Sequence, residues 1–265
     1  MTLTSSQNDL NLTTDSSTCS NTLTEHINRQ MARIARETRA NERYYRRKKC
    51  FPDESFFEMT FDNNAEKQTD AYDKAVKYAE HFEVFREKRA GMIFQGGYGT
   101  GKTYLAACVA NALIDQGYTC RLTTMESAVR GLMDAAERDV YLKTLTEVDL
   151  LIIDDLGAEY QSDFMTAMAF EIINARYITR KPLIVTTNFT KDAISDPPPA
   201  WHRVMSRLWE MCVTVPFEGE DKRRAKLKAR QRKMKKRETA ATGQFDATSL
   251  TNKTGNKKFA IDEAP

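Results

Sequence analysis

The sequence predicts an α/β fold in which a five-stranded parallel sheet lies between helices, with a helical N-terminal extension and a basic C-terminal tail. Two observations carry this prediction. From residue 91 onward, five short apolar segments alternate with amphipathic helical patterns. The apolar segments are hydrophobic throughout, which is typical of parallel strands covered on both faces.

The chain begins with a polar segment. Among residues 1–22, seventeen are Ser, Thr, Asn, Asp or Gln. Such a segment cannot bury enough apolar surface to offset the entropy lost on ordering, so we expect residues 1–22 to be disordered.

A basic helix is expected next, over residues 23–50. A capping-box pattern begins it, and Ile27, Met31 and Ile34 recur at the spacing of one helical face. Arginines occupy the rest of its surface, and a Phe-Pro pair ends it. Three interpretations stay open: the helix packs on its own core, docks on another protein, or contacts nucleic acid directly. We expect docking on a partner.

The sheet and its helices follow. The expected strands are residues 92–94, 119–123, 150–153, 183–187 and 213–215, and the expected helices are residues 102–116, 125–136 and 163–179. Gly117 is expected to end the first of these helices, and Ser162 to cap the last one at its N-terminus.

A basic tail closes the chain, and we expect residues 225–265 to be largely disordered. Residues 222–237 hold 11 Lys or Arg and no acid within 16 positions. So many cations would release counterions from a phosphate backbone, and binding would weaken steeply with salt. No aromatic residue lies among them, so neither base stacking nor sequence readout is expected from this segment.

Charge and cysteine content narrow the class of protein. Residues 1–50 hold 9 Lys or Arg against 5 Asp or Glu, residues 51–221 hold 17 against 28, and residues 222–265 hold 14 against 4. Basic ends around an acidic middle indicate an anionic partner for the ends.

The five cysteines form no CxxC pair, which argues against a zinc knuckle or a disulfide framework. Without a secretory signal or a long apolar run, we expect a cytoplasmic protein with no membrane partner.

A phosphate-binding motif joins the first strand to the first helix of the sheet. The nucleotide-binding residues are expected to be Gly96, Gly97, Tyr98, Gly99, Thr100, Gly101, Lys102, Thr103 and the adjoining Tyr104. The pattern G-x-x-x-x-G-K-[ST] lets backbone N–H groups point at phosphates, and Lys102 would reach the β and γ oxygens. The hydroxyl of Thr103 would bind Mg²⁺. ATP and Mg²⁺ are therefore the expected cofactors.

Polar residues at the ends of two further strands complete this site. Asp154 follows four apolar residues, and it is expected to bind Mg²⁺ at the carboxyl end of its strand. Asp155 would orient and deprotonate the attacking water. Asn188 ends the next strand along the chain, where its amide would position that water.

In this order the motifs resemble those of AAA+ ATPases with a P-loop NTPase fold, and more narrowly the DnaC/DnaI-type helicase loaders with their IstB-like relatives. The resemblance covers residues 51–224, which are expected to form the ATPase domain, and includes LLIIDDLG at 150–157, RVMSRL at 203–208 and FEGEDKRR at 217–224. It implies that Asn188 is the sensor-1 residue. It also implies that Arg207 is an arginine finger reaching the ATP of a neighbouring subunit, and that Arg223 is the sensor-2 arginine.

The chain departs from these loaders in three respects. They often carry Asp-Glu at the second motif, whereas this chain has Asp154 and Asp155, so hydrolysis is expected to be slow and stimulated by assembly. The zinc-binding cysteines of DnaI-type proteins are absent, so any docking region here is expected to be helical and metal-free. The long basic tail is closer to the IstB-like pattern.

These observations predict an ATP-dependent, DnaC-like loader that places a DnaB-type replicative hexameric helicase on single-stranded DNA. Self-assembly would use the arginine finger. The alternative is an IstB-like ATPase that assembles on duplex DNA and regulates a transposase. A small-molecule P-loop kinase is disfavoured, because the sequence lacks an acceptor-binding lid and has two basic ends compatible with DNA.

Overall fold

A computed structural model of the 265-residue chain describes residues 15–65, 67–157, 163–219, 221–224, 227–228 and 230–234. The described residues form two compact units. The first comprises those up to Gly96 and from Gly101 to Phe217, and the second comprises residues 97–100 and those from Glu218 onward.

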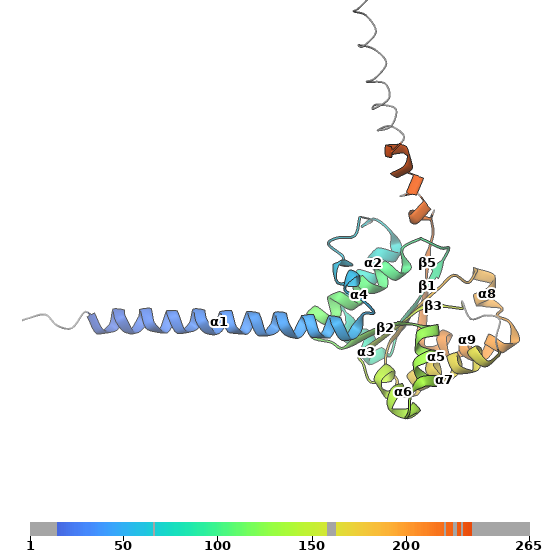
Figure 1. Cartoon of the computed structure of the whole chain (residues 1–265), viewed down its shortest axis with the longest axis horizontal. Helices are drawn as coiled ribbons and strands as arrows, with labels where there is room; N and C mark the ends of the chain where they lie inside the picture. Colours follow the sequence, from blue (N-terminus) through green and yellow to red (C-terminus); the bar gives the residue numbers. More distant parts are fainter. Residues whose placement is uncertain are drawn as a thin grey trace, which may run out of the picture. The chain divides into compact units, whose positions relative to one another are not determined.

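The first unit is built on a five-stranded parallel sheet (Figure 1). Its strands are β1 (Gly91–Gly96), β2 (Cys120–Thr124), β3 (Leu150–Leu156), β4 (Leu183–Thr187) and β5 (Cys212–Phe217). They lie in the order β2-β3-β4-β1-β5, and each neighbouring pair is parallel. The predicted five-stranded parallel sheet is therefore confirmed.

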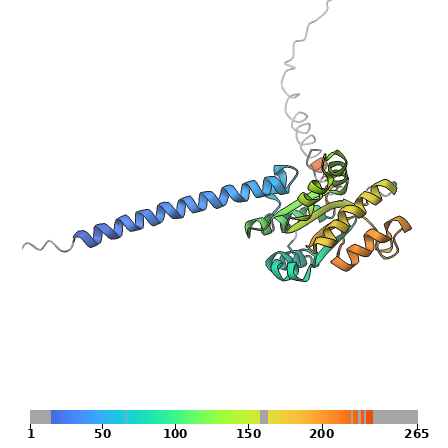
Figure 2. The same cartoon turned by 90° about the horizontal axis from the view of Figure 1, so that it is seen from below.

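Helices cover both faces of the sheet, as Figures 1 and 2 show. The α-helices are α1 (Asp15–Cys50), α2 (Asp70–Glu80), α3 (Phe82–Lys88), α4 (Lys102–Asp115), α5 (Met125–Asp134), α6 (Arg138–Thr146), α7 (Asp163–Thr179), α8 (Lys191–Ser195) and α9 (His202–Met211). Two 3-10 helices, η1 (Glu54–Glu58) and η2 (Pro199–Trp201), join them. One core packs α2, α3 and α4 on side chains such as Phe94 and Ile152. The other packs α5, α6, α7 and α9 on the alternating side chains, such as Ile93 and Ile153.

We call residues 51–96 and 101–217 of the first unit the sheet domain. Its helices end at positions that local sequence signals indicate. Gly117 adopts φ +98° one residue beyond the cap of α4 at Gln116, where the N–H of Tyr118 donates to the carbonyl of Leu113. The helix α7 has the predicted bounds. Its predicted cap, Ser162, lies outside the described residues.

The N-terminal helix is longer than predicted. It begins at Asp15 within a segment expected to be disordered, instead of at residue 23. Ser, Thr and Asn are modest helix formers, but extending an existing helix costs far less than nucleating a new one. The polar composition alone therefore misplaced the start of α1.

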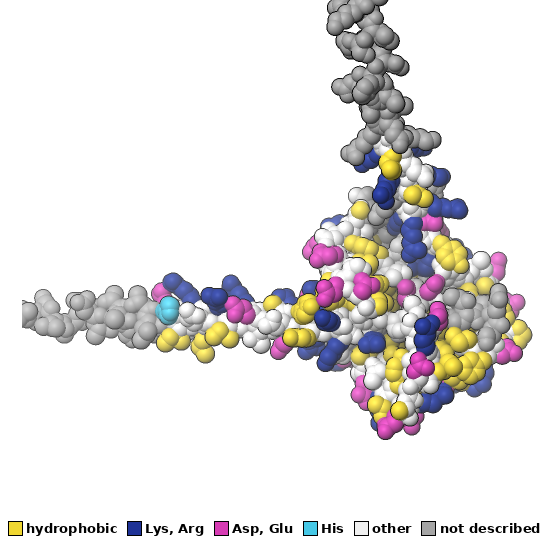
Figure 3. Space-filling view, viewed as in Figure 1, with side chains coloured by type: hydrophobic (Ala, Val, Ile, Leu, Met, Phe, Trp, Pro, Cys, Tyr) yellow, Lys and Arg dark blue, Asp and Glu magenta, His cyan; other side chains and the backbone are white. Residues whose placement is uncertain are grey.

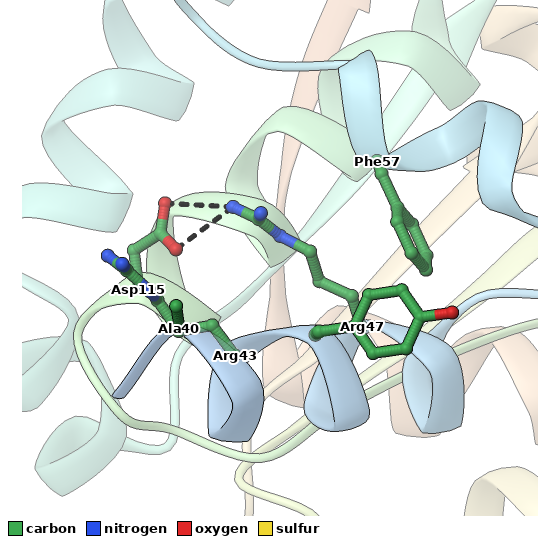
Figure 4. A pocket seen from close by; sticks show the side chains of 6 residues that line it. Ala40, Arg43, Arg47, Phe57 and Asp115 are labelled. Atoms are coloured by element: carbon green, nitrogen blue, oxygen red, sulfur yellow. Dashed lines mark hydrogen bonds and ion pairs between the residues drawn. The ribbon is translucent and has the colours of Figure 1, made fainter. Parts of the chain in front are cut away.

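The C-terminal end of α1 packs on the sheet domain, against α4 and β2. Arg47 donates two hydrogen bonds to the carboxylate of Asp115, at 2.9 and 3.0 Å (Figure 4). The guanidinium of Arg46 donates to the carbonyl of Gly117, and Cys50 is buried. A cavity of about 310 Å³ lies beside this junction and is lined by Ala40, Arg43, Tyr44, Arg47, Phe57 and Asp115.

The next part of α1 toward the N-terminus, residues 25–39, does not pack on the chain's own core. Every described side chain from Glu25 to Tyr45 is exposed, including Ile27, Met31 and Ile34, which are 48%, 65% and 60% exposed. Of the three interpretations of this helix, packing on the chain's own core is therefore excluded for residues 25–39, whereas Tyr44 packs on Phe57.

The described part of the tail is helical at residues 222–224, 227–228 and 230–234, although residues 225–265 were expected to be largely disordered. These short stretches do not decide the expectation for the tail as a whole, which stays a prediction. Lys, Arg, Gln, Leu and Met are good helix formers even where nothing packs against them.

Candidate functional site

The carboxyl ends of three neighbouring strands bring polar side chains together. Because β4 lies between β1 and β3, residues that follow or end these strands meet at one edge of the sheet. Lys102 and Thr103 begin α4 after β1, Asp154 and Asp155 end β3, and Asn188 directly follows β4. Ligands of open parallel α/β sheets bind at this edge.

Lys102 is held at the centre of this group. Its side chain is buried, and its ammonium donates to the carbonyl of Gly96 and to Oδ1 of Asn188, both at 2.8 Å. Gly101 precedes it at φ +99°, and no side chain caps α4 there. A buried cation at the N-terminus of a helix makes this end of α4 strongly attractive to an anion.

Asp154 and Thr103 form the second pair. The hydroxyl of Thr103 donates to the carboxylate of Asp154, with distances of 2.9 and 3.1 Å to its two oxygens. Burial raises the pKa of Asp154, while hydrogen bonds from Thr186 and Thr103 act in the opposite direction. The pair presents a hydroxyl and a carboxylate side by side, which are oxygen ligands that suit Mg²⁺.

Asp155 has an unusual backbone. It adopts φ +59°, a left-handed conformation that costs energy for a residue other than glycine. The strand pairing explains how this arises. Ile153 lies opposite Val185 and Leu156 opposite Thr187, so three steps of β3 match two of β4 and β3 bulges at the acids.

Side-chain hydrogen bonds hold this strained turn. The amide of Asn188 donates to Oδ1 of Asp155 at 2.6 Å, and the N–H of Asp155 donates to Oγ1 of Thr186 at 2.9 Å. That same Oγ1 donates to Oδ1 of Asp154 at 2.6 Å. The carboxylate of Asp155 is therefore exposed but fixed in direction.

Residues 97–100 of the glycine-rich motif lie in the second unit and contact its later residues. The hydroxyl of Thr100 donates to the carbonyl of Gly97 at 2.9 Å, and the N–H of Lys222 donates to the carbonyl of Gly99 at 3.1 Å. Gly99 has φ +70°, and a Cβ there would overlap Asp221. The exposed side chain of Tyr98 completes this segment.

The two arginines of the sequence prediction have different surroundings. Arg207, on α9, stacks 4.3 Å from the ring centroid of Tyr177 on α7 and pairs with Glu210 at 3.5 Å. These contacts are apart from the cluster around Lys102. Arg223 is exposed in the second unit, where its backbone N–H donates to Asp221 at 2.9 Å.

Sequence reasoning missed the role of one residue near the site, Thr186. Thr186 was seen only as part of a polar strand end, although its hydroxyl bonds to both acids. A threonine that interrupts a buried apolar strand beside two acids could have signalled this. Tyr104, expected among the nucleotide-binding residues, packs its ring against the core that includes Phe94, and its contact with a nucleotide stays a prediction.

Taken together, these residues fit a magnesium–nucleotide complex. Lys102 and the start of α4 offer positive charge for phosphate groups, and Thr103 with Asp154 offers oxygen ligands for Mg²⁺. An exposed, oriented carboxylate on Asp155 can accept a proton from water.

Comparisons with known proteins agree with this chemistry. A family model described as IstB-like ATP binding protein matches residues 2–231. The replicative helicase loader DnaC of Escherichia coli strain K12 is 29% identical over 148 residues, which cover 54% of this chain and 58% of that protein. The uncharacterized protein YqaM of Bacillus subtilis strain 168 is 29% identical over 151 residues, covering 54% and 47%. The chain thus matches these curated relatives over only about half of their length.

Two solved structures share the fold. Crystal structures of DnaI and of the DnaC helicase loader each superpose with a TM-score of 0.54 at 23% identity. The match covers 65% of this chain and 94% of the former structure, and 63% and 100% for the latter. These likenesses, with those to DnaA, confirm the AAA+ P-loop fold. Within the part of the chain that is described, no helix is long and apolar enough to cross a membrane.

Proposed function

Because the chain belongs to the family of IstB-like ATP-binding proteins, we propose that it is an Mg²⁺-dependent ATPase that places a replicative hexameric helicase on single-stranded DNA. ATP binding and hydrolysis would act as the switch between holding and releasing that helicase. The observation that carries the proposal is the cluster of Lys102, Thr103, Asp154, Asp155 and Asn188 at one edge of the sheet.

Each member of this cluster has a proposed role. Lys102 binds the β and γ phosphates, giving up its bond to Asn188 when the nucleotide arrives. Thr103 and Asp154 hold Mg²⁺, which neutralises charge that develops on the phosphate oxygens. Asp155 accepts the proton of the attacking water, and Asn188 keeps its carboxylate in place. A short Asp at this position, where the loaders often carry Glu, supports slow hydrolysis.

The two arginines belong to the proposal through the family resemblance. Arg207 would stabilise the transferring phosphoryl group of a neighbouring subunit, and Arg223 would do so in its own subunit. An arginine supplied by a neighbour makes hydrolysis depend on assembly. The side chain of Arg207 is 34% exposed, and to reach a neighbour's nucleotide it would have to leave Tyr177 and Glu210.

The helicase is the proposed partner of the apolar face of α1, which we define as Ile27, Met31 and Ile34. This face is exposed and unsupported by the sheet domain, as expected of a helix that docks in the groove of a partner. The similarity to DnaC, a replicative helicase loader by name, supports the identity of that partner.

A second candidate function is an ATPase that assembles on duplex DNA and regulates a transposase. The family description and the 11 cations of residues 222–237 favour it. The two candidates differ in the DNA on which ATP-dependent assembly takes place.

Mass photometry of the full chain tests both candidates. The protein is weighed with ATP or ADP, on single-stranded and on duplex oligonucleotides, and Lys102→Ala serves as the control that removes the phosphate-binding cation. Assembly with ATP on single strands is the expected result. Assembly along duplex would favour the transposase regulator, and no ATP-dependent assembly on either would contradict both.

Capture of the host's replicative helicase tests the partner separately. Replacing Ile27, Met31 and Ile34 with Ser is expected to abolish capture. The matched control replaces Val84, Val140 and Ile178, three comparably exposed apolar residues of the sheet domain, and should leave capture intact. If the chain captures no helicase in the presence of either ATP or ADP, the proposed loader function is contradicted.

A further inference from the structure

A row of arginines lies opposite the apolar face of α1. Every basic residue from 29 to 47 is an arginine. At about 100° of rotation per residue, five of them fall within a sector of about 120°, centred opposite Met31 and its neighbours. We call these five the arginine face: Arg29, Arg33, Arg36, Arg39 and Arg43. Figure 3 shows basic side chains along one edge of α1 and hydrophobic side chains along the other.

The arginine face is available to a ligand. All five side chains are exposed. Arg29 pairs with Glu25 at 3.1 Å and Arg33 with Glu37 at 2.9 Å, but both pairs are exposed and each is held within one helical turn. Such pairs contribute little and yield readily to a stronger anion. For the other three arginines, no ion pair is found among the described residues.

The chemistry of the row fits phosphate groups. A planar guanidinium can donate two parallel hydrogen bonds to one phosphate, which an ammonium cannot do. Arg43 lines the cavity beside Asp115, whereas the other four arginines precede the residues of α1 that line it. The lysines of α1, Lys48 and Lys49, lie at its C-terminal end, where the helix joins the sheet domain.

We propose that the arginine face of α1 binds the phosphate backbone of duplex DNA. From Arg29 to Arg43 it spans about 21 Å, the length of about six base-pair steps. A straight row of charges suits a stiff line of phosphates, whereas a flexible single strand would lose entropy by lying along it. No aromatic residue lies within residues 25–43 on which unpaired bases could stack.

This inference is independent of the proposed ATPase activity, since it involves no residue of the nucleotide cluster. The apolar face and the arginine face point in opposite directions, so a protein and a duplex could occupy α1 together. The helix would thereby hold a duplex segment next to the protein docked on its other side.

Fluorescence anisotropy of the full chain on a labelled duplex of about 30 base pairs, without nucleotide and over a range of KCl concentrations, tests the proposal. One variant replaces the five arginines of the face with Gln, which keeps helix propensity. The matched control replaces five exposed cations of the sheet domain, Lys74, Lys77, Lys88, Arg130 and Lys143, with Gln. The control set also contains two intrahelical ion pairs and removes the same net charge.

We expect the arginine-face variant to bind duplex more than about tenfold more weakly at low salt, with a salt slope smaller by about 0.9 for each phosphate that is no longer neutralised. At about 0.15 M KCl the control variant should bind within about threefold of the original chain, because charges more than about 8 Å from the phosphates are largely screened at that ionic strength. Replacing the same five arginines with Lys keeps the charge, so it should keep most of the salt slope. Circular dichroism establishes that both Gln variants retain their helix content.

Three outcomes would overturn the proposal. If the arginine-face variant and the control lose the same affinity for duplex, the loss is explained by net charge and not by the arginine face. If the arginine-face variant loses the same affinity for a single strand of the same length, duplex DNA is not the specific ligand of the arginine face. Unchanged duplex binding would leave an acidic protein surface as the ligand of the arginine face. None of these outcomes affects ATP-dependent assembly, which is measured separately.

Discussion

The hydroxyl of Thr186 donates to Oδ1 of Asp154 at 2.6 Å, from a threonine that is itself 1% exposed. Oγ1 of Thr186 also accepts a hydrogen bond from the backbone N–H of Asp155. One side chain on β4 thus orients both acids on β3, across the bulge that places Asp155 at positive φ. Thr186 contacts neither nucleotide nor water in the proposed mechanism, so it is a positioning residue.

Replacing Thr186 with Val is expected to slow ATP hydrolysis by about 10- to 100-fold with little change in KM for ATP. Val keeps the shape of Thr but removes the bond to Asp154 and leaves the N–H of Asp155 without its acceptor. Steady-state kinetics on the full chain measures the split between kcat and KM. Thr186→Ser restores the hydroxyl and should recover most of the rate.

Thr187→Val is the matched control for that experiment. Thr187 is equally buried on the same strand, but its hydroxyl donates to the carbonyl of Leu156 and not to an acid. Thr187→Val should lower the free energy of unfolding but should reduce kcat less than Thr186→Val does. Equal kinetic defects in the two Val variants would mean that Thr186 acts only through the fold.

Asp154→Asn is expected to stabilise the fold while lowering hydrolysis by more than about 100-fold. Burial raises the pKa of Asp154 in the folded chain above its unfolded value, so its charged form is disfavoured there. The stability that this carboxyl contributes is present below the unfolded pKa and is lost as pH rises through the folded pKa. Asn avoids this loss and still accepts the two hydroxyl hydrogen bonds.

Urea unfolding at about pH 7 and about pH 4 measures this effect. The variant should be more stable than the original chain at the higher pH, and the difference should shrink at the lower one. A variant that is less stable at both pH values would contradict the raised pKa.

Arg176→Met is expected to destabilise the sheet domain by about 3–5 kcal/mol. Arg176 is fully buried on α7 and donates to the carbonyls of Thr146, Val148, Asp149 and Pro182. Burial lowers its pKa to about 10, so it remains charged at neutral pH. Met fills similar volume but leaves these carbonyls unsatisfied.

Chemical denaturation of the full chain measures this destabilisation. Arg130→Met, at an exposed position on α5, should change the unfolding free energy by less than about 0.5 kcal/mol. A change of similar size in both variants would show that the carbonyl contacts of Arg176 contribute little.

Arg207→Ala is expected to lower the assembly-stimulated hydrolysis rate by about 100-fold or more, with little effect on the rate of dilute protein. The proposed reason is that the guanidinium acts on the nucleotide of a neighbour. The rate is measured as a function of protein concentration on single-stranded DNA. Arg203→Ala is the matched control, because Arg203 stacks on Phe170 one turn earlier on α9. Loss of the concentration dependence in the control as well would point to a packing defect of α9.

The strands and the motif residues could be predicted because local signals specify them. Five apolar runs became five parallel strands, and β4 has the predicted bounds. β3 extends to Leu156 where the sequence indicated Ile153, because the bulge lets the acids continue the pairing with β4. No local pattern indicates a bulge that depends on the register of two strands distant in sequence.

Side-chain partners were harder to predict for the same reason. The bond between Asn188 and Asp155 and the stacking of Arg207 on Tyr177 join elements about 30 residues apart. Arg176 gave no sequence signal, since an arginine within a helix is ordinarily exposed. The start of α1 was missed because helix propagation depends on neighbouring turns more than on composition.

The continuity of α1 has one more consequence. From Asp15 to Cys50 it contains neither Pro nor Gly, and Arg47 fastens it to Asp115 at the far end. Along one unbroken helix the directions of all side chains are fixed relative to one another. Deleting one residue between Ile34 and Arg43 would therefore rotate every earlier side chain by about 100° about the helix axis. An insertion of seven residues there would keep the apolar face within about 20° of its present direction and would move it about 10 Å further from the sheet domain. The number of residues in this segment therefore fixes the direction in which a partner bound to α1 faces and its distance from the sheet domain.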